Sequence, residues 1–458
     1  MKQHPFWRRG EFWLSAGGLA VLAAVFLAWY RGREVSGPGL AAALCSAGLF
    51  AAICLRFVPE WLAFWRRERA GQADLPLRGA RAEPRYREGK IFLSLLLVEA
   101  AVVLAVYLLR RRAGYQGSFV EGLSFWTCTD SGHYLDIARD WYLSEGEWDR
   151  LVQLVFLPGY PLAVRLVDLL VGNLLYSGML VSALSFAGAG CVLYRLFRLD
   201  CPHGDALRAV RWFCLLPGGF FFAAPMSESL FLLLCAACLY CARTERWTLG
   251  CVLGGLAAFT RSLGLTLLVP LLFELVSRAA RRRERPTSPR RLAGRGAALL
   301  LIPAGFGVYC WINYLVAGSP FQFMEYQRLH WSQQLGWFFN TAAYQTDLAI
   351  QCWGNNLHNL LGLWLPNLLA TFSSLIVMLL AVKKLRPSYT AWYLAYFVVA
   401  IGATWLLSAP RYLIALIPLP LSLARLTRRP AVDALVSLVS GLLYLLYLYA
   451  FVMRWQVW

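Results

Sequence analysis

Long apolar runs separated by short polar connections recur along almost the whole chain. A helix that spans a membrane needs about 20 mainly apolar residues. Thirteen runs, several of them short, are candidate spans: 12–30, 39–57, 91–109, 174–194, 207–222, 228–242, 248–260, 263–277, 297–316, 357–382, 390–407, 411–424 and 431–453. This pattern predicts an all-α polytopic membrane protein with about 11–13 transmembrane helices.

A shorter apolar stretch, 158–171, starts with Pro158-Gly159-Tyr160-Pro161, and we expect it to be re-entrant or interfacial. The start MKQHPFWRRGEFW leads into a long apolar run without a small-residue cleavage site, which predicts an uncleaved first helix. No polar block between the runs is large enough to fold by itself. We therefore expect one polytopic membrane domain.

The composition agrees with a polytopic membrane protein and excludes other classes of protein. Hydrophobic residues make up 59% of the 458 residues and charged residues only 15%, against about 25% charged residues in ordinary soluble domains. This excludes a soluble enzyme. The net charge is +19, but the basic residues, 40 of 44 of them Arg, cluster in short connections between apolar runs. We interpret them as signals of membrane topology and not as a nucleic-acid surface.

The distribution of Lys and Arg predicts the side of the membrane for each connection. With a cytoplasmic N-terminus, the cytoplasmic connections hold 32 of the 44 Lys and Arg, which is the asymmetry of the positive-inside rule. Two long polar loops, about 110–157 and 317–356, then lie at the outer face, where we expect the functional site. The first loop holds seven of the 25 acidic residues: Glu121, Asp130, Asp136, Asp140, Glu145, Glu147 and Asp149.

Cysteine usage gives little support for metal or redox chemistry. Cys235, Cys238 and Cys241 have CxxC spacing, yet no second CxxC or CxxH follows, which favours buried small hydrophobic residues. Cys128 and Cys352 both fall at the predicted outer face, where a disulfide between them is an open alternative. The chain has no Gly-rich nucleotide-binding loop, so ATP-driven chemistry has no support.

The first outer loop carries a candidate catalytic base. Asp130 stands at the start of a predicted helix, where its carboxylate could take a proton from an acceptor hydroxyl. The apolar face of this helix, expected to lie on the membrane surface, consists of Tyr134, Ile137, Ala138 and Trp141. The alternative is that Asp130 only caps the helix.

Further ionisable residues lie at the rims of predicted spans. Ser227 can cap a span, and Glu228 lies in its first turn. Arg261 and Arg411 occupy two other short turns at the same predicted face. Because an ionisable residue at a membrane is costly, each needs a partner or a ligand. Two guanidinium groups suit a lipid-linked phosphate, and the alternative is an ion pair of Arg261 with Glu228 or Asp130.

The second outer loop is rich in aromatic and amide side chains between 320 and 331, among them Gln322 and Trp331. Carbohydrate sites use such side chains, and so does the aromatic belt of a membrane interface. Both interpretations stay open. At the same face, His133, His330 and His358 lack HxxxH or HxxxE spacing, so no metal site is predicted.

Five short motifs follow one another along the chain: DSGHYLDIA at 130–138, LPGYPLAVR at 157–165, PMSESL at 225–230, RSLG at 261–264 and PRY at 410–412. In this order they resemble the PIG-V family, the GPI mannosyltransferase II proteins and their bacterial relatives, within the GT-C class of membrane glycosyltransferases. The resemblance covers about residues 91–424. It departs from the family pattern at Thr129, where the family has Trp, and in two helices, about 12–57, that precede the family-like first span.

The resemblance implies the transfer of a hexose, expected to be mannose, with inversion. The donor would be a polyprenyl-phosphate-linked sugar, and the acceptor a glycolipid, glycan or protein at the outer face. Asp130 would deprotonate the acceptor hydroxyl, while Arg261 and Arg411 would stabilise the departing phosphate. No cofactor or metal is expected, because polyprenyl-phosphate-mannose is itself the donor substrate. The expected partners are the lipid bilayer, the donor and the acceptor, and not nucleic acid.

The resemblance also implies a GT-C-like bundle with three segments. These are 1–90 with two additional helices and a basic cytoplasmic loop, 91–424 with the catalytic membrane domain, and 425–458 with the C-terminal helix. Asp130 is the expected catalytic residue. Expected substrate-binding residues are His133, Tyr134, Pro158, Tyr160, Glu228, Arg261, Gln322, Trp331, Arg411 and Tyr412.

Two other classes of function stay open. A transporter or flippase of a lipid-linked or polar solute places ionisable residues at the bilayer midplane, often with internal repeats, whereas here they collect at one predicted face. A scaffold without activity would agree with the missing Trp-Asp pair. The preference for Arg over Lys indicates a GC-rich genome and favours a bacterial plasma membrane over the endoplasmic reticulum.

Overall fold

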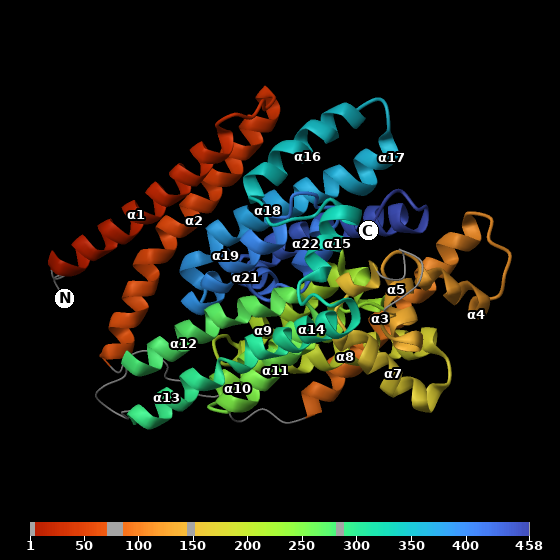
Figure 1. Cartoon of the computed structure of the whole chain (residues 1–458), viewed down its shortest axis with the longest axis horizontal. Coiled ribbons are helices and arrows are strands. Elements are labelled where there is room, and N and C mark those ends of the chain that lie inside the picture. The colour runs from red at the N-terminus through yellow and green to blue at the C-terminus, as the bar shows by residue number, and fades with distance from the viewer. Residues whose placement is uncertain (1–4, 71–85, 144–151, 281–287, 458) are drawn as a thin grey trace.

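The computed structural model describes residues 5–70, 86–143, 152–280 and 288–457. These residues are almost entirely helical, and the extended structure among them is limited to one isolated bridge between Leu335 and Ala403. Figure 1 shows a bundle of long helices, with α1 and α2 along one edge and the short helices α4, α5 and α7 near one end. The prediction of an all-α polytopic protein is confirmed.

Eight helical segments in the described part of the chain are long and apolar enough to cross a membrane. They are formed by α1 (Pro5–Tyr30), α2 (Gly37–Arg69), α3 (Tyr86–Arg112), α8 (Leu174–Arg198), η4 with α12 (Ser262–Leu267, Leu268–Ala280), α13 with α14 (Pro289–Ala298, Leu301–Ala317), α17 through η6 (Leu357–Asn359, Leu360–Trp364, Leu365–Ala381, Val382–Lys384) and α22 (Pro430–Val452). The five other predicted spans form shorter helices, and the last of these spans, 411–424, forms two of them. The helices are α9 (His203–Leu215), α10 (Glu228–Arg243), α11 (Trp247–Thr260), α19 (Pro387–Ile401), α20 (Ala409–Ile414) and α21 (Pro418–Leu426).

Two predicted spans are interrupted. The run 207–222 becomes α9 followed, after Pro217-Gly218, by the short helix η3 (Gly219–Ala223). The run 411–424 divides into α20 and α21, and Pro418 occupies the first position of α21. Proline has no backbone N–H and cannot continue a preceding helix, so a break before it is expected. These breaks leave Arg411 on a helix of six residues.

The remaining helices are α4 (Phe119–Gly122), η1 (Leu123–Thr127), α5 (Ser131–Asp140), η2 (Val152–Val155), α7 (Gly159–Val171), α15 (Gln322–Trp331) and α16 (Phe338–Cys352). The predicted loop 317–356 is thus mostly helical, and α16 packs against α2. The stretch 158–171 forms the short helix α7, on which Leu166, Leu169 and Leu170 are exposed.

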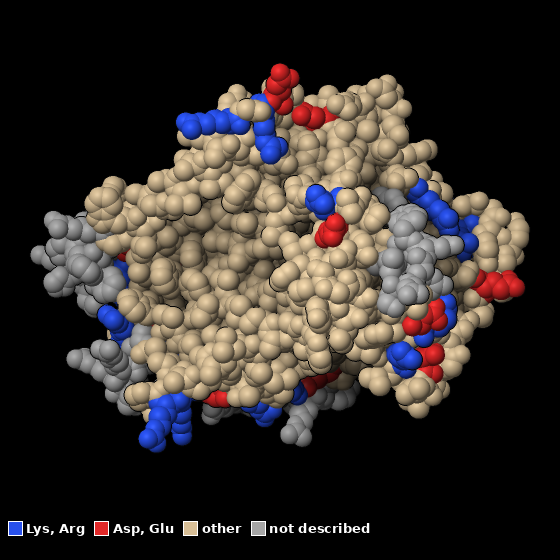
Figure 2. All heavy atoms as spheres, viewed as in Figure 1, with Lys and Arg blue, Asp and Glu red and all other residues tan. Residues whose placement is uncertain are grey.

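Large apolar side chains are exposed along the outside of the bundle. On α3 and α22 they follow helical spacing, at Leu93, Leu97, Leu104 and Leu108 and at Leu435, Leu438, Leu442 and Leu445. Figure 2 shows charged side chains mainly near the margins of this view and, between them, a broad surface with few charged side chains that is hollowed in its middle. In water such a surface would be unfavourable, whereas lipid tails match it. The chain is an integral membrane protein.

The N-terminal helices are joined to the rest of the bundle. Helix α2 packs against α16, α18 and α19. Its Glu68 lies 3.9 Å from Arg386, whose guanidinium also donates to Glu274 of α12 at 2.6 and 2.8 Å. All three side chains are buried. The expected segment boundaries at 90 and 424 stay predictions.

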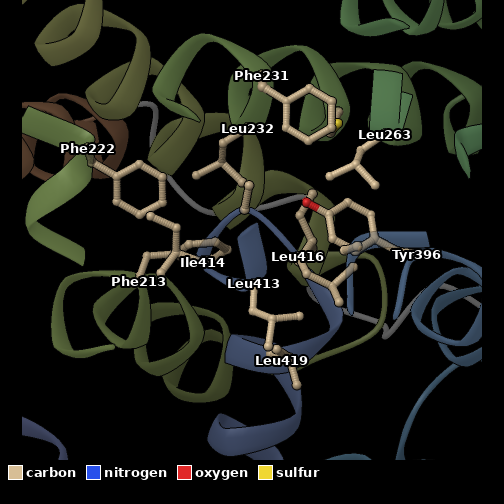
Figure 3. Close-up of a cluster of buried hydrophobic side chains, with 14 of the residues drawn as sticks. Phe213, Phe222, Phe231, Leu232, Leu263, Tyr396, Leu413, Ile414, Leu416 and Leu419 are labelled. Atoms are coloured by element: carbon tan, nitrogen blue, oxygen red, sulfur yellow. The ribbon is translucent and has the colours of Figure 1, made fainter. Parts of the chain in front are cut away.

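The apolar core lies in the middle of the bundle. Figure 3 shows Phe222 of η3, Phe231 and Leu232 of α10, Leu263 of η4, Tyr396 of α19 and Leu413, Ile414, Leu416 and Leu419 of the α20–α21 region facing one another. All of these side chains are at least nine-tenths buried. Helices α11 and α14 approach even more closely, because a Cβ on Gly305 would lie 2.0 Å from the carbonyl oxygen of Gly255. Such small-residue contacts are typical of membrane helices.

Candidate active site

Asp130 stands at the entry to α5, behind a constrained turn. The preceding Trp126 is buried and packs on Phe451 of α22, with ring centroids 6.0 Å apart. Thr129 then adopts φ +56°, a left-handed conformation that is rare for a β-branched residue. Such strain is common at functional sites. Trp126 therefore anchors the loop, and Thr129, in the place of the family's Trp, provides the turn.

The carboxylate of Asp130 pairs with Arg411. The two side chains form an ion pair although 281 positions separate them. Asp130 occupies the N-cap position of α5, but its side chain makes no capping hydrogen bond. The alternative that Asp130 only caps the helix is therefore wrong, because the guanidinium of Arg411 holds its carboxylate.

Glu228 joins the two arginines. Its carboxylate forms an ion pair with Arg261, and its Oε1 lies 3.3 Å from Nε of Arg411. Arg261 also donates to the hydroxyl of Ser227 at 3.1 Å. The alternative that Arg261 forms an ion pair with Glu228 is confirmed, whereas Asp130 pairs with Arg411. Ser227 occupies the N-cap position of α10 without capping it, since its hydroxyl faces this cluster.

These contacts define an acid–arginine cluster of Asp130, Glu228, Arg261 and Arg411. With both carboxylates ionised the cluster has no net charge. Its side chains differ in exposure, at 25% for Asp130, 11% for Arg261, 7% for Arg411 and 2% for Glu228. Asp130 is the open member of the cluster, and so it is the carboxylate that a substrate can reach first. Oε2 of Glu228 makes no hydrogen bond to the described residues.

Tyr412 lies beside both arginines. The guanidinium carbons of Arg261 and Arg411 are 5.2 and 5.8 Å from its ring centroid. A cation within about 6 Å of an aromatic face is attracted to it. The carbonyl of Tyr412 accepts a hydrogen bond from the phenol of Tyr396 at 2.7 Å, which fixes α20 to α19.

Two buried tyrosines support the cluster from the first and second motifs. The hydroxyl of Tyr134 lies 3.0 Å from that of Ser227, and burial raises the pKa of this phenol above its usual range. The ring of Tyr134 meets that of Tyr160 edge to face at 5.4 Å. Tyr160 in turn hydrogen-bonds Ser182 at 2.9 Å, and Ser182 donates to the carbonyl of Ala224 at 2.7 Å. These bonds tie α5, α7 and α8 to the turn before α10.

Pro158 and Gly159 bring the second motif against the fourth. Pro158 is buried directly before α7. A Cβ on Gly159 would lie 2.4 Å from Oγ1 and 2.8 Å from Cα of Thr260, the residue before Arg261. Glycine is thus required for α7 to reach the end of α11.

The backbone before Arg411 is held by polar side chains from α16 and α18. The amide of Asn367 accepts from the backbone N–H of Ala409 at 2.8 Å. Gln345 donates to the carbonyl of Leu406 at 2.9 Å, and the hydroxyl of Tyr344 accepts from the N–H of Leu406 at 2.6 Å. These contacts fix the path of the chain into α20.

Aromatic rings extend from α5 toward α15. His133 stacks on Phe156 with ring centroids 4.8 Å apart, and Trp331 meets Phe156 edge to face at 6.1 Å. Trp331 therefore lies near the first motif, and its role in substrate binding stays a prediction. The amide of Gln322 donates to Glu325 of the same helix at 3.3 Å, and among the described side chains no hydrogen bond or ion pair links Gln322 to the cluster. Its assignment to substrate binding stays a prediction.

Other predictions have mixed outcomes. Cys128 and Cys352 are both free thiols, so no disulfide joins them, while Cys235, Cys238 and Cys241 are buried as predicted. The apolar face of α5 packs on α7 and α8 instead of lying on the membrane surface. Among the described residues no group of three or more His, Cys, Asp or Glu is arranged to hold a metal. Glu145, Glu147 and Asp149 lie outside the described residues.

Several residues at the site were not predicted. Phe156, Tyr396, Gln345 and Asn367 all support it through the contacts above. Phe156 directly precedes the second motif, and that position was the available signal. Tyr396, Gln345 and Asn367 lie in apolar or mixed stretches where the sequence offers no comparable cue.

Residues 111–292 match the family model described as "Mannosyltransferase (PIG-V)". No curated protein and no solved structure matches the chain. The matched stretch is less than half of the chain, yet it contains four of the five motifs and three members of the acid–arginine cluster, Asp130, Glu228 and Arg261. In its motifs and in this match the chain is similar to the PIG-V family, whose model is described as a mannosyltransferase.

Proposed function

We propose that this chain transfers a hexose, mannose, from a polyprenyl-phosphate-linked donor to an acceptor hydroxyl, with inversion at the anomeric carbon. The observation that carries the proposal is the acid–arginine cluster. Four segments far apart in the sequence each contribute one charged side chain to it, and the family match lies over three of them.

Asp130 is the proposed general base. It is the most exposed carboxylate of the cluster, whereas Glu228 is enclosed between two arginines. As the acceptor oxygen attacks the anomeric carbon, its proton passes to Asp130. Attack from the face opposite the phosphate gives inversion. His133, Phe156 and Trp331 offer ring faces and edges beside Asp130 for the sugar or the acceptor.

Arg261 and Arg411 are the proposed partners of the donor phosphate. Guanidinium groups bind phosphate through paired charged hydrogen bonds. Negative charge grows on the phosphate as the sugar leaves, so fixed cations favour the transition state. All charges in this scheme belong to protein side chains and the donor, and the proposed reaction needs no resident cofactor.

An apolar cavity of about 200 Å³ supports a lipid-linked donor. It lies between α18, α20, α21 and α22, and Leu365, Leu369 and Val377 line it along α18. Pro410, the residue before Arg411, also lines it. A polyprenyl chain bound here would gain from the removal of apolar surface from water or lipid headgroups, and its phosphate would end beside a guanidinium.

We further propose that the site faces the outside of a bacterial plasma membrane. The asymmetry of Lys and Arg between the two sets of connections supports this orientation.

The test is transfer of label from radiolabelled polyprenyl-phosphate-mannose into membrane lipid and protein fractions by the purified protein. We expect label in one fraction with the native protein, none with Asp130→Asn, and native transfer with the control Asp136→Asn, which changes a partly exposed carboxylate of the same helix. Undiminished transfer by Asp130→Asn would refute its assignment as base. Accumulation of donor in proteoliposomes without a covalent product would favour transport instead.

A further inference from the structure

The charged side chains of the acid–arginine cluster pair with one another, although the proposed reaction needs them to act on the substrates. Arg411 already holds Asp130, and Arg261 already holds Glu228. A base paired with a guanidinium is a weak base, and a guanidinium paired with a carboxylate is a weak phosphate ligand. For both groups to act, the pairing between Asp130 and Arg411 must change during the reaction.

We propose that Arg411 exchanges partners during transfer, leaving Asp130 as that carboxylate is protonated and taking up the leaving phosphate. This inference rests on the proposed function and adds to it a coupling between the base and the phosphate site. The exchange makes Asp130 a control on phosphate affinity as well as a base. It also makes the cluster favour the product lipid phosphate over the donor.

The charges of the proposed step balance. The acceptor O–H bond breaks, its proton goes to Asp130, and an oxygen electron pair forms the new bond to the anomeric carbon. The bond between that carbon and the phosphate oxygen breaks, and its electron pair stays on the oxygen. The donor phosphate, a diester with one negative charge, becomes a monoester with two. Asp130 loses one negative charge in the same step, so the total charge of cluster and phosphate is unchanged.

The exposures and distances fit such an exchange. Asp130 is the most exposed member of the cluster, and Arg411 is nearly buried behind it, so a ligand next to Asp130 is also next to Arg411. When Asp130 is neutral, Arg411 still has Glu228, whose Oε1 lies 3.3 Å from its Nε. That nitrogen has no hydrogen-bond partner among the described residues. Arg411 can therefore turn one face to the phosphate while Glu228 keeps it in place.

The main chain need not move for this exchange. Asn367, Gln345 and Tyr344 hold the backbone between Leu406 and Ala409, and Tyr396 holds the carbonyl of Tyr412. The guanidinium is thus the mobile part on a fixed backbone. A short movement of one side chain between two acceptors is sufficient.

The experiment measures binding of farnesyl phosphate, a short lipid phosphate monoester, to the purified full chain without any acceptor. Asn at position 130 imitates the protonated carboxyl in size and charge. We expect Asp130→Asn to bind farnesyl phosphate at least about tenfold more tightly than the native protein, a difference of about 1.4 kcal/mol. The control Asp136→Asn, whose carboxylate pairs with Arg139 on the exposed side of α5, should bind as the native protein does.

A double-mutant cycle separates partner exchange from simple loss of negative charge. Asp130→Asn is therefore also made in an Arg411→Gln background, where we expect the tenfold gain to disappear. A gain that persists there would overturn the exchange, since it would show a general electrostatic effect. Equal or weaker binding by Asp130→Asn alone would also overturn it. Native-like thermal unfolding of each variant establishes that it is folded.

Failure of this inference and failure of the proposed function give different results. If Asp130→Asn transfers mannose normally while the binding cycle behaves as expected, the base assignment is wrong and the coupling between Asp130 and Arg411 stands. If Asp130→Asn abolishes transfer but leaves phosphate affinity unchanged, the proposed function stands and the exchange is wrong. If no variant binds farnesyl phosphate, both the lipid-phosphate donor and the exchange are overturned.

Discussion

Glu228 is the member of the acid–arginine cluster whose replacement tests the electrostatic argument most directly. Its side chain is 2% exposed, forms an ion pair with Arg261 and lies 3.3 Å from Arg411. Glu228→Gln keeps the shape of the side chain and removes its charge. The cluster then changes from balanced to one excess positive charge.

The size of the expected loss of stability depends on the contacts that Arg261 keeps in Glu228→Gln. Leaving one partner of a buried ion pair unpaired costs about 3–5 kcal/mol. Arg261 retains the hydroxyl of Ser227 at 3.1 Å and the ring of Tyr412, and its side chain is 11% exposed. We therefore expect a loss near the lower limit, about 3 kcal/mol of unfolding free energy.

The assay is equilibrium unfolding by SDS in mixed micelles, with Glu325→Gln as the control. Glu325 is an exposed carboxylate on α15 that accepts a hydrogen bond from Gln322, and its replacement should change stability by less than about 0.5 kcal/mol. Farnesyl phosphate should stabilise Glu228→Gln more than the native protein, because the phosphate restores the missing negative charge. A loss below about 1 kcal/mol, or no added effect of the phosphate, would refute this account.

Three further predictions concern other parts of the site. Gly159→Ala places a Cβ 2.4 Å from Oγ1 of Thr260, so we expect the free energy of unfolding to fall by about 1–3 kcal/mol and transfer in the radiolabel assay to slow. The control Gly204→Ala, with open space around its Cβ, should have neither effect. Burial raises the pKa of the Cys128 thiol to about 11, and the thiolate is the nucleophile. Iodoacetamide should therefore alkylate a variant with Cys128 as its single cysteine slowly at pH 7.5 and faster as the pH rises toward 11. Rapid alkylation at pH 7.5 would contradict a buried thiol. Ala370→Trp fills the cavity beside Pro410 and should raise KM for a long-chain donor about tenfold, the equivalent of about two buried methylene groups. The KM for a short-chain donor should not change. The control Ile376→Trp, on the exposed side of α18, should change neither KM.

The helices and the motifs could be predicted from the sequence because both are local. Apolar runs of sufficient length indicated all eight candidate spans, and the motif residues Asp130, Glu228, Arg261 and Arg411 indeed meet. Pairing could not be predicted, since Asp130 and Arg411 are 281 positions apart and nothing local distinguishes Arg411 from Arg261 as its partner. The same limit explains the capping roles assigned to Asp130 and Ser227, which tertiary contacts override.

Polar side chains inside apolar stretches were the other source of error. Asn367 and Gln345 each hold the backbone before Arg411, but in the sequence they look like any polar residue of a membrane helix. Gln322 had the composition of a carbohydrate site around it, and yet its side-chain amide hydrogen-bonds Glu325 of its own helix. Composition identifies a region, whereas the direction of each side chain depends on packing.

The position of Arg411 in the chain has a consequence for biosynthesis. Asp130, Glu228 and Arg261 enter the membrane early, and until α20 arrives they form an incomplete group with an excess negative charge. Because the chain is made from its N-terminus, Arg411 is added 281 residues after Asp130. A chain whose synthesis stops before Arg411 therefore has no completed site, and catalytic competence requires that α20 has been made.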